Sequence, residues 1–317
     1  MKVSIITAFY HGNAYMDQYV AAIRANQRHM NLGDELEAVI VNDSPDDPVQ
    51  LPVDGSSCNI WVFEQKKNGG IHRARVRGLQ ECKGEYVMFL DQDDLIAEDA
   101  IAKHVEKIKL WKKQMVTANA RSPMVRGTYL ERLVLHPVSV SNAYLEQADG
   151  SNVLWYRSEY HKHKVVDYKT YLKVGVQIVS PGQCLVPKKM IPPIWQTKIC
   201  KKNGADDYYL WLLLLADCVP FTMLDEPLYI HKHTGENLSS DTKKMDNSTY
   251  EFIKYLKEGS VVSKKDIATL ERMTKYKDDF RNGGAGTKLL STCRNLDIFI
   301  ANAIFKVRSK TPYGFNR

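Results

Sequence analysis

The sequence lacks the features that mark membrane-spanning, disulfide-stabilised or zinc-binding proteins. Its strongest apolar run, residues 210–216, is far shorter than the roughly 20 residues that cross a bilayer. Only 6 cysteines occur in 317 residues, and no two of them form a Cys-x-x-Cys pair. Scattered cysteines argue against a zinc site and a disulfide framework and are typical of a reducing compartment. We therefore expect a cytoplasmic protein.

Signals of secretion, repetition and disorder are also missing. The amino terminus turns polar at His11 and carries no cleavage pattern, so we expect a first buried strand in place of a signal peptide. Hydrophobic residues make up 44% and charged residues 26%, which is typical of a globular chain. The net charge of +7 and the pI near 8.9 suit an anionic partner, or simply a solvated basic surface.

The first third of the chain alternates between short apolar runs and amphipathic segments. We expect strands at residues 3–8, 36–41, 59–63 and 86–90, and helices at 14–28 and 71–80. This alternation predicts βαβ units and a mostly parallel sheet.

The pattern changes after residue 111. We expect strand-rich segments at 116–135 and 165–186, separated by an aromatic stretch that favours no element. A short helix at 206–215, a strand near 227–230 and helices beyond residue 240 complete the prediction.

Three carboxylates follow the fourth expected strand. Asp91, Asp93 and Asp94 repel one another unless a cation neutralises them, and Mg²⁺ or Mn²⁺ prefers such oxygen ligands together with substrate phosphates. The alternative is that Asp93 and Asp94 only cap the next helix. Because ligands of open α/β sheets bind at the carboxyl ends of the strands, the position favours a metal site.

A glycine-containing loop precedes the second expected helix. In Asn68-Gly69-Gly70 the glycines let backbone amides approach an anion, and Arg73, Arg75 and Arg77 follow on the helix. The alternative is an ordinary loop before a basic, solvated helix.

Together these motifs resemble those of family 2 glycosyltransferases, which have the GT-A fold and invert the anomeric centre. The matching segments are Ser4-Ile5-Ile6-Thr7, Val41-Asn42-Asp43-Ser44, Asn68-x-Gly70, Ala74-Arg75, Gly84-Glu85-Tyr86 and Leu90-Asp91-Gln92-Asp93-Asp94. Further on, Gly204-Ala205-Asp206-Asp207-Tyr208 is similar to the family's Glu-Asp motif, which supplies the base. His233 with Asn237 and Ser239 resembles the segment that closes over the metal and diphosphate.

The resemblance implies an α/β, GT-A-like fold: a mostly parallel central sheet flanked by helices, an acceptor-side subdomain and a helical carboxyl-terminal tail. It divides the chain into a nucleotide-sugar-binding half (1–115), an acceptor-binding and catalytic half (116–240) and a helical region (241–317). The implied reaction moves a sugar from a nucleoside-diphosphate sugar, UDP-sugar foremost, to a hydroxyl of a glycan or lipid-linked acceptor. Bacterial surface polysaccharide synthesis, such as that of capsule, is the expected setting.

The resemblance also assigns roles to individual residues. The residues expected to contact the nucleotide sugar are Thr7, Ala8, Phe9, Tyr10, Asp43, Asn68, Arg75, Asp91 and Gln92. Asp93 and His233 are expected to hold Mn²⁺ or Mg²⁺, with His231 as a competitor for the second place. Asp207, or else Asp206, is the expected base. Gln183 and Trp211 are expected on the acceptor side, although four leucines after Trp211 favour a core position.

The sequence departs from the family pattern at several places. Asn42 stands where Asp is common, Asp206 where Glu is usual, and Val76 where Asn often follows the arginine. The first departure leaves the uracil-facing role to Asp43 alone. The second leaves either aspartate of the pair able to act as base.

The tail carries an apolar face, formed by Leu289, Cys293, Leu296, Ile300, Ala303, Ile304 and Val307, beside several basic residues. Such a helix either lies on an anionic membrane surface or packs against the rest of the chain. Two other functions compete with transfer. A nucleotidyltransferase would carry a glycine-rich basic loop after the first strand, and a degenerate binding module would have lost the carboxylates. No nucleic-acid recognition motif is present, so we expect no nucleic-acid partner.

Overall fold

The structure, a computed structural model, describes residues 1–52, 58–119, 135–235 and 241–311. The chain forms two compact units. Unit 1 comprises Met1–Leu154, Val179–Ile191 and Cys218–Gly235, and unit 2 comprises Trp155–Ile178, Pro192–Asp217 and the described part of Glu236–Arg317. The expected assignment of donor and acceptor roles to residues 1–115 and 116–240 stays a prediction, and its first boundary falls inside a helix of unit 1.

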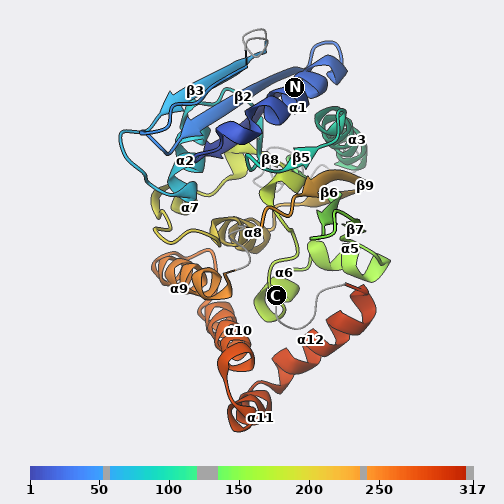
Figure 1. The fold of residues 1–317 in the computed structure, drawn as a ribbon. Helices are drawn as coiled ribbons and strands as arrows, with labels where there is room; N and C mark the ends of the chain where they lie inside the picture. Colours follow the sequence, from blue (N-terminus) through green and yellow to red (C-terminus); the bar gives the residue numbers. More distant parts are fainter. Residues whose placement is uncertain (53–57, 120–134, 236–240, 312–317) are drawn as a thin grey trace. The chain divides into compact units, whose positions relative to one another are not determined.

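Unit 1 is built on one curled sheet, in which the described residues form nine strands (Figure 1). Their order is β3-β2-β1-β4-β8-β6-β9-β5, and β7 pairs with β6. The strands are β1 (Lys2–Phe9), β2 (Glu35–Asn42), β3 (Ile60–Glu64), β4 (Tyr86–Phe89), β5 (Leu95–Ile96), β6 (Val138–Glu146), β7 (Asn152–Leu154), β8 (Cys184–Pro187) and β9 (Phe221–His231).

The first half of this sheet is parallel, as the alternating pattern predicts. Strands β3, β2, β1 and β4 all run in one direction, and Ile5 of β1 lies between Ala38 and Met88 of its neighbours. All three side chains are fully buried, because helices cover both faces of a parallel sheet. The second half is mixed. Strand β8 runs antiparallel to β4 and β6, and β9 runs parallel to β6.

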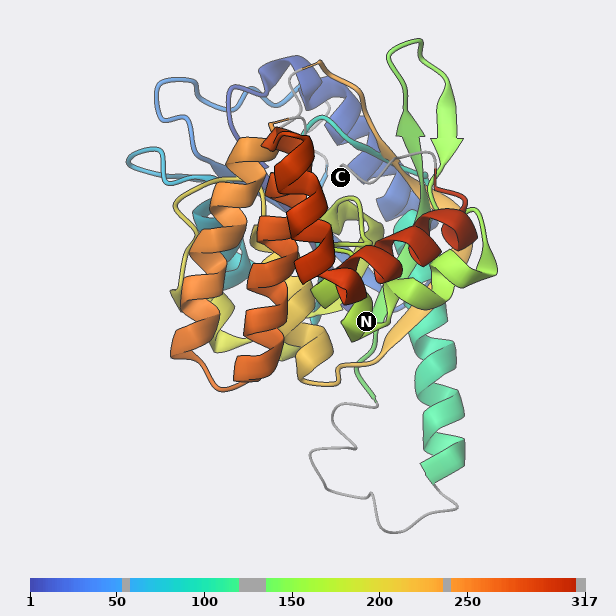
Figure 2. The same ribbon diagram turned by 90° about the horizontal axis from the view of Figure 1, so that it is seen from below.

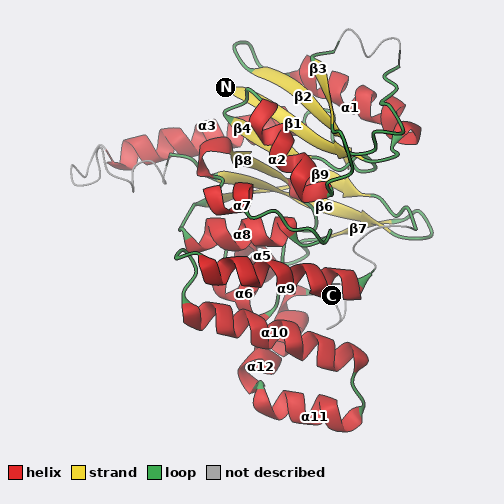
Figure 3. Ribbon diagram, turned by 90° about the vertical axis from the view of Figure 1, so that its left-hand side faces the viewer, coloured by secondary structure: helices red, strands yellow, loops and turns green. Residues whose placement is uncertain are grey.

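Among its described residues, three α-helices flank the sheet of unit 1: α1 (Met16–His29), α2 (Ile71–Glu81) and α3 (Ala100–Asn119). Right-handed crossovers place α1 and α2 on opposite faces of the sheet, because the chain moves outward from β1 to β2 and back from β3 to β4 (Figure 3). Helix α2 lies close to the strands at Gly78, where a Cβ atom would be 2.3 Å from Cγ2 of Ile6. Because β1, β2 and β4 run parallel, their carboxyl ends lie at the same edge of the sheet.

The regular elements among the described residues of unit 2 are all helices. Its helices are α5 (Glu159–Val165), α6 (Tyr168–Lys173), α7 (Pro193–Thr197), α8 (Asp206–Ala216), α9 (Thr242–Glu258), α10 (Lys264–Asn282), α11 (Ala285–Arg294) and α12 (Leu296–Ser309). Helices α9 and α10 lie side by side (Figure 2). Its core includes Tyr209 of α8 stacked on Phe252 of α9, with ring centroids 5.5 Å apart. The helical tail is confirmed.

The expected strand-rich segment at 165–186 is wrong, and the one at 116–135 falls mostly outside the described residues. Residues 116–119 belong to α3, and residues 120–134 lie outside the described part of the chain. Within 165–186 the structure has the end of α5, helix α6 and only the beginning of β8. Ser158 and Asp167 explain this difference, because their side chains cap α5 and α6 and so favour helix over strand.

No helix in the described ranges is both long and apolar enough to cross a membrane.

Candidate active site

The polar residues that follow β1, β2 and β4 lie at one edge of the sheet in unit 1. The register pairs Phe9 with Asn42 and Ile6 with Phe89, so the three strands end near one another. The backbone amide of Asp43 donates to the carbonyl of Phe9 at 2.8 Å. The expected gathering of Tyr10, Asp43 and Asp91 at the carboxyl edge follows from this arrangement.

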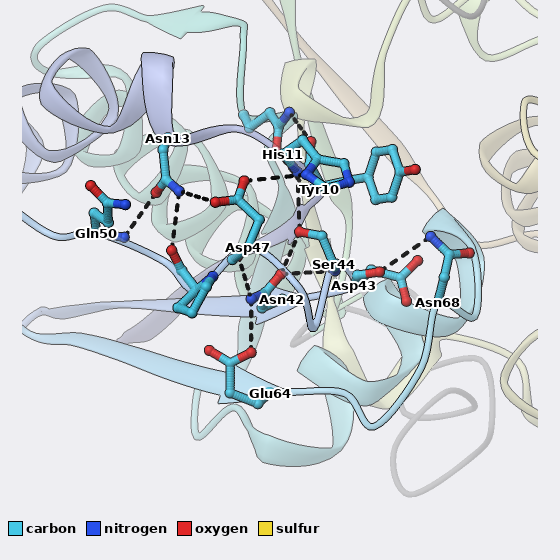
Figure 4. A network of polar contacts seen from close by, with 12 residues as sticks. Tyr10, His11, Asn13, Asn42, Asp43, Ser44, Asp47, Gln50, Glu64 and Asn68 are labelled. Atoms are coloured by element: carbon cyan, nitrogen blue, oxygen red, sulfur yellow. Dashed lines mark hydrogen bonds and ion pairs between the residues drawn. The ribbon is translucent and has the colours of Figure 1, made fainter.

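Asp43 is the anchor of the loop that leads into α2. Its Oδ1 atom accepts hydrogen bonds of 2.7 Å from the amide of Gly69 and from Nε2 of Gln65, and its Oδ2 atom accepts one of 2.8 Å from the amide of Gly70. Asn68 donates to the Asp43 carbonyl (Figure 4). Burial raises the pKa of Asp43, and the two glycine amides oppose that rise. This carboxylate therefore fixes the whole 65–70 loop.

The glycine loop binds an anion, but one that belongs to the chain itself. Gly70 has φ of 84°, a conformation that favours glycine, and it begins α2. Its amide and that of Gly69 both donate to Asp43. We expected these amides to be available to a ligand phosphate, whereas the structure commits both to a side chain. Gln65, which contributes to the same cluster, has no distinguishing signal in the sequence.

The departure at Asn42 has a structural reason. Its Nδ2 atom donates to Oε2 of Glu64 at 2.7 Å and to the Asp47 carbonyl at 3.0 Å, and its Oδ1 atom accepts from both the amide and the hydroxyl of Ser44 (Figure 4). Only an amide supplies two donors and an acceptor at this place. An aspartate would set a carboxylate against Glu64, so Asn42 suits this particular neighbour.

The loops after β1 and β4 are joined by a reciprocal pair of hydrogen bonds. The Tyr10 amide donates to Oε1 of Gln92, and Nε2 of Gln92 donates to the Tyr10 carbonyl, both at 2.9 Å. A Cβ atom at Gly12 would lie 2.3 Å from Oε1 of Gln92, so a larger residue there would displace the Gln92 side chain from this bridge. The Tyr10 ring is 54% exposed above this edge.

The end of β1, just before Tyr10, is buried except at Ala8. Thr7 and Phe9 are fully buried, and Oγ1 of Thr7 donates to the hydroxyl of Tyr19 at 3.0 Å. Ala8 is half-buried. Among the four residues of this stretch, Ala8 and Tyr10 are therefore the ones whose side chains a ligand can reach.

Arg75 and Asp91 form an ion pair at this carboxyl edge of the sheet. The Nη2 atom of Arg75 lies 2.5 Å from Oδ1 of Asp91, and Ser180 donates from Oγ to Oδ2 of Asp91 at 3.3 Å. The Arg75 side chain is buried, while Asp91 keeps a quarter of its surface exposed. Asp91 is thereby oriented by two neighbours and remains reachable from solvent.

Asp93 and Asp94 have separate roles. Burial, together with the charges of Asp94 and Asp91, raises the pKa of Asp93 to about 7. Asp94 is almost fully buried and accepts hydrogen bonds from the Tyr229 hydroxyl and, at 2.8 Å, from the Lys232 amide. Asp94 therefore fastens the end of β9 to the carboxylate motif, whereas Asp93 is a half-buried carboxyl among like charges.

The two candidate histidines differ in their surroundings. The Nδ1 atom of His231 lies 3.2 Å from Oδ1 of Asp94, and the charge of His231 lowers the pKa of Asp93. His233 is exposed. Asn237 and Ser239, the other expected members of this segment, lie outside the described residues. Within the described ranges no group of three or more His, Cys, Asp or Glu side chains is arranged to hold a metal ion.

The aspartate pair belongs to unit 2 and begins α8. Asp206 is almost fully buried and Asp207 is half-buried. The backbone at this point is held from two sides, because Ser248 accepts from the Ala205 amide at 3.1 Å and Trp195 donates to the Asp206 carbonyl at 2.8 Å. Gly204, with φ of 126°, allows the chain to enter the helix here.

The two residues expected on the acceptor side are both fully buried. In unit 1, Gln183 donates from Nε2 to the Ser141 carbonyl at 3.0 Å and accepts from the Val179 amide at 2.7 Å. In unit 2, Trp211 lies in the core of α8, as its leucine neighbours favour. Contact with an acceptor would require other side chains to move, and the acceptor role of both residues stays a prediction.

Comparisons with known proteins agree with this geometry. The profile of glycosyl transferase family 2 matches residues 4–162, half of the chain. An uncharacterized glycosyltransferase of Haemophilus influenzae is 29% identical over 106 residues, which are 32% of this chain and 40% of that protein. The minor teichoic acid biosynthesis protein GgaB of Bacillus subtilis is 32% identical over 99 residues, which are 30% of this chain and 11% of that protein. The chain thus covers less than half of either relative.

Among solved structures, S. aureus TarS 1-349 in complex with UDP-GlcNAc superimposes with a TM-score of 0.59 and 15% identity. The match covers 95% of this chain and 81% of that one, and it supports the GT-A-like fold. Fold, motif order and family profile thus agree, and the chain belongs to glycosyl transferase family 2.

Proposed function

We propose that the protein is an inverting, metal-dependent glycosyltransferase that uses a nucleoside-diphosphate sugar, UDP-sugar foremost. The observation that carries the proposal is the arrangement at the carboxyl edge of unit 1. There the ion pair of Arg75 and Asp91 lies beside Asp93, and the Tyr10–Gln92 bridge joins the loops after β1 and β4. The exposed Tyr10 ring and the solvent-accessible part of Asp91 offer a flat surface and a hydrogen-bond acceptor to a nucleoside.

The residues present fit a divalent cation that shares its ligands with the substrate. Asp93 is a carboxyl held among like charges, and Asp91 keeps one side toward solvent. Hard cations such as Mg²⁺ are commonly held by one or two carboxylates, with substrate phosphates completing the shell. When bound, the cation would act as a Lewis acid that stabilises negative charge on the departing nucleoside diphosphate.

We infer that His231, rather than His233, is the histidine that faces this cation. A histidine that ligates a metal through one ring nitrogen usually donates a hydrogen bond from the other to a carboxylate. The Nδ1 atom of His231 has such a partner in Asp94. His231 also lies within electrostatic reach of Asp93. We therefore propose His231 in place of His233, whose side chain is exposed.

Asp207 is the proposed base. An acceptor hydroxyl must lose its proton as it attacks the anomeric carbon, and a carboxylate within hydrogen-bond reach can take it. The half-buried Asp207 is accessible to an acceptor, whereas Asp206 is almost fully buried. Direct displacement by the acceptor inverts the anomeric centre. Both aspartates lie in the first turn of α8, where the helix dipole favours the carboxylate form.

The acceptor is proposed to be a glycan or lipid-linked oligosaccharide of a bacterial surface polymer such as capsule or teichoic acid. The name of GgaB, and that of a teichoic acid poly(glycerol phosphate) polymerase of Staphylococcus epidermidis that is 29% identical over 110 residues, support this setting. A cytoplasmic location, where nucleotide sugars are made, is part of the same proposal.

The test is transfer from a panel of nucleotide sugars, with Mn²⁺ or with EDTA. We expect release of one nucleoside diphosphate that requires the metal. Asp207→Asn should lower the turnover number by on the order of a hundredfold or more and leave donor binding intact. Asp93→Asn should abolish the effect of Mn²⁺ on donor affinity. Asp17→Asn, at an exposed position of α1, is the matched control. If no nucleotide sugar binds in the presence of Mn²⁺, the proposal is wrong.

A further inference from the structure

Helix α12 buries one face against its neighbours in unit 2 and exposes a second face, which is apolar. Its inner face carries Ile298, Asn302, Phe305 and Ser309, all buried. Phe305 meets the ring of His161 edge-on with centroids 5.2 Å apart, and Asn302 donates to the Lys173 carbonyl at 2.8 Å. These contacts fix α12 against α5 and α6 within unit 2. The orientation of the helix about its own axis is therefore determined.

The opposite face of α12 is apolar and exposed. Leu296, Ile300, Ile304 and Val307 repeat at helical spacing and are 54%, 52%, 45% and 78% exposed. With 100° between successive residues, these four side chains point about 180° away from the buried face. Leu289 and Leu290 of α11 add exposed fractions of 68% and 51%. A contiguous apolar face of this kind on a protein surface marks an interaction site.

At 100° per residue, Lys306 and Arg308 lie on the two sides of this exposed face of α12. Between residues 285 and 310 the basic side chains are Lys288, Arg294, Lys306, Arg308 and Lys310, and the acidic side chain is Asp297. Asp297 is already neutralised by Arg272 at 2.5 Å and Lys173 at 3.1 Å. The segment therefore presents apolar side chains within a positively charged border. That combination complements a surface with an apolar interior and an anionic rim.

The size of the face argues against two other occupants. A stable interface between two protein copies involves about 20–30 residues from each side, so it would have to extend well beyond these six apolar side chains. A membrane-spanning role is also disfavoured, because no described helix is long and apolar enough to cross a bilayer. A helix that lies in the membrane interface needs only one apolar face and a basic border.

We propose that the exposed face of α11 and α12 binds an anionic lipid surface, with Leu296, Ile300, Ile304 and Val307 inserted among the acyl chains. Arg294, Lys306 and Lys310 contact the phosphates of the headgroups. The inference is independent of the transfer reaction, because it concerns residues far along the chain from the carboxylate motif. It defines a peripheral attachment that holds the enzyme on a membrane without spanning it.

The test is co-sedimentation of the full chain with vesicles. One set contains equal parts of phosphatidylcholine and phosphatidylglycerol, and the other contains phosphatidylcholine alone. We expect binding to the anionic vesicles that weakens as salt is raised. The double variant Ile300→Glu/Ile304→Glu should lose at least about tenfold in affinity, because two charges replace inserted side chains. Leu32→Glu, at a fully exposed leucine of unit 1, should bind as wild type does.

Circular dichroism and the thermal midpoint should be unchanged in both variants, since all substituted side chains are exposed. Sedimentation velocity of the wild-type chain without vesicles examines the competing occupant. A stable dimer that Ile300→Glu/Ile304→Glu dissociates, without vesicle binding, would overturn the proposal in favour of a second copy. Equal binding of wild type and the double variant to anionic vesicles would also overturn it. Because nucleotide-sugar binding is measured separately, failure here leaves the transferase proposal intact.

Discussion

The guanidinium group of Arg75 lies 2.5 Å from the carboxylate of Asp91 and joins α2 to the end of β4. Arg75 follows the glycine loop that Asp43 anchors, so one chain of contacts runs from β2 through the loop and α2 to β4. The parts of the edge that we propose to face the nucleotide are thus held by side chains that also stabilise the fold. Substitutions there should change stability and ligand affinity together.

Replacing Arg75 by methionine should lower the free energy of unfolding by about 1.5–3 kcal/mol, because a charged hydrogen bond is lost while Asp91 keeps access to solvent. Nucleotide-sugar affinity should fall at least about tenfold, since Asp91 loses its orientation. Urea unfolding and calorimetric titration measure the two effects. Arg77→Met, at an exposed position of the same helix, should stay within about 0.5 kcal/mol of wild type. Equal values for the two variants would contradict this assignment.

Asp43→Asn tests the loop anchor. Gln65, Gly69 and Gly70 all donate to the Asp43 carboxylate. The NH2 group of an asparagine would therefore face another donor at one of these sites. We expect a loss of about 1–3 kcal/mol, the cost of a buried donor without an acceptor. Faster amide hydrogen exchange at residues 65–70 would show that the loop itself is released. Unchanged exchange there would mean that the loop is held by other contacts.

Gly78→Ala should destabilise the protein by about 1–3 kcal/mol through overpacking. The added Cβ would lie 2.3 Å from Cγ2 of Ile6 and 3.4 Å from Cγ2 of Val41, so α2 would have to move away from the sheet. Gly286→Ala in α11 is the matched control, because a Cβ there meets no atom within 4 Å. That control should be neutral or stabilising by up to about 1 kcal/mol. Thermal unfolding of both variants decides the point.

Stability should fall as the pH drops below the ordinary histidine pKa. Burial lowers the pKa of His104 to about 3 and that of His161 to about 4. Because both folded-state pKa values lie below the unfolded value, the unfolded chain binds more protons, and stability present above pH 6.5 is lost below it. Each histidine contributes a slope of up to about 1.4 kcal/mol per pH unit.

The measurement is the free energy of unfolding between about pH 6.5 and pH 4. In His104→Gln the free energy of unfolding should change less steeply with pH, because one proton fewer is bound on unfolding. His29→Gln, at an exposed position of α1, should keep the wild-type slope. A slope that is the same in all three proteins would show that His104 does not remain neutral in the folded state.

The parallel half of the sheet could be predicted because its signal is local. The run from Val3 to Phe9 is apolar and rich in β-branched residues, and such a run predicts a strand buried on both faces. The carboxylates that follow β4 stand directly after another such run. Their place at the edge then follows from the general behaviour of parallel sheets.

The helix at 206–215, the strand near 227–230 and the helical tail could also be predicted, whereas residues 165–183 could not, because capping bonds and long-range contacts decide their structure. The valines between residues 165 and 186 favour strands, but Ser158 and Asp167 satisfy the first amides of α5 and α6 and stabilise helices. The partnership of Tyr229 with Asp94 joins residues 135 positions apart, and no spacing rule reveals it. Trp211 was correctly favoured as a core residue because its leucine neighbours form a continuous apolar run.

The hydrogen bonds between Asp94 and β9 also affect the order in which parts of the chain can fold. Since β9 pairs with both β6 and β5, and its Tyr229 and Lys232 hold Asp94, the carboxylate motif acquires its final geometry only after those residues have joined the sheet. A chain still on the ribosome, with the loops after β1, β2 and β4 already synthesised, would lack that support. Such distant pairing slows folding. The carboxyl edge of the sheet is thus completed only after residue 232 has been synthesised.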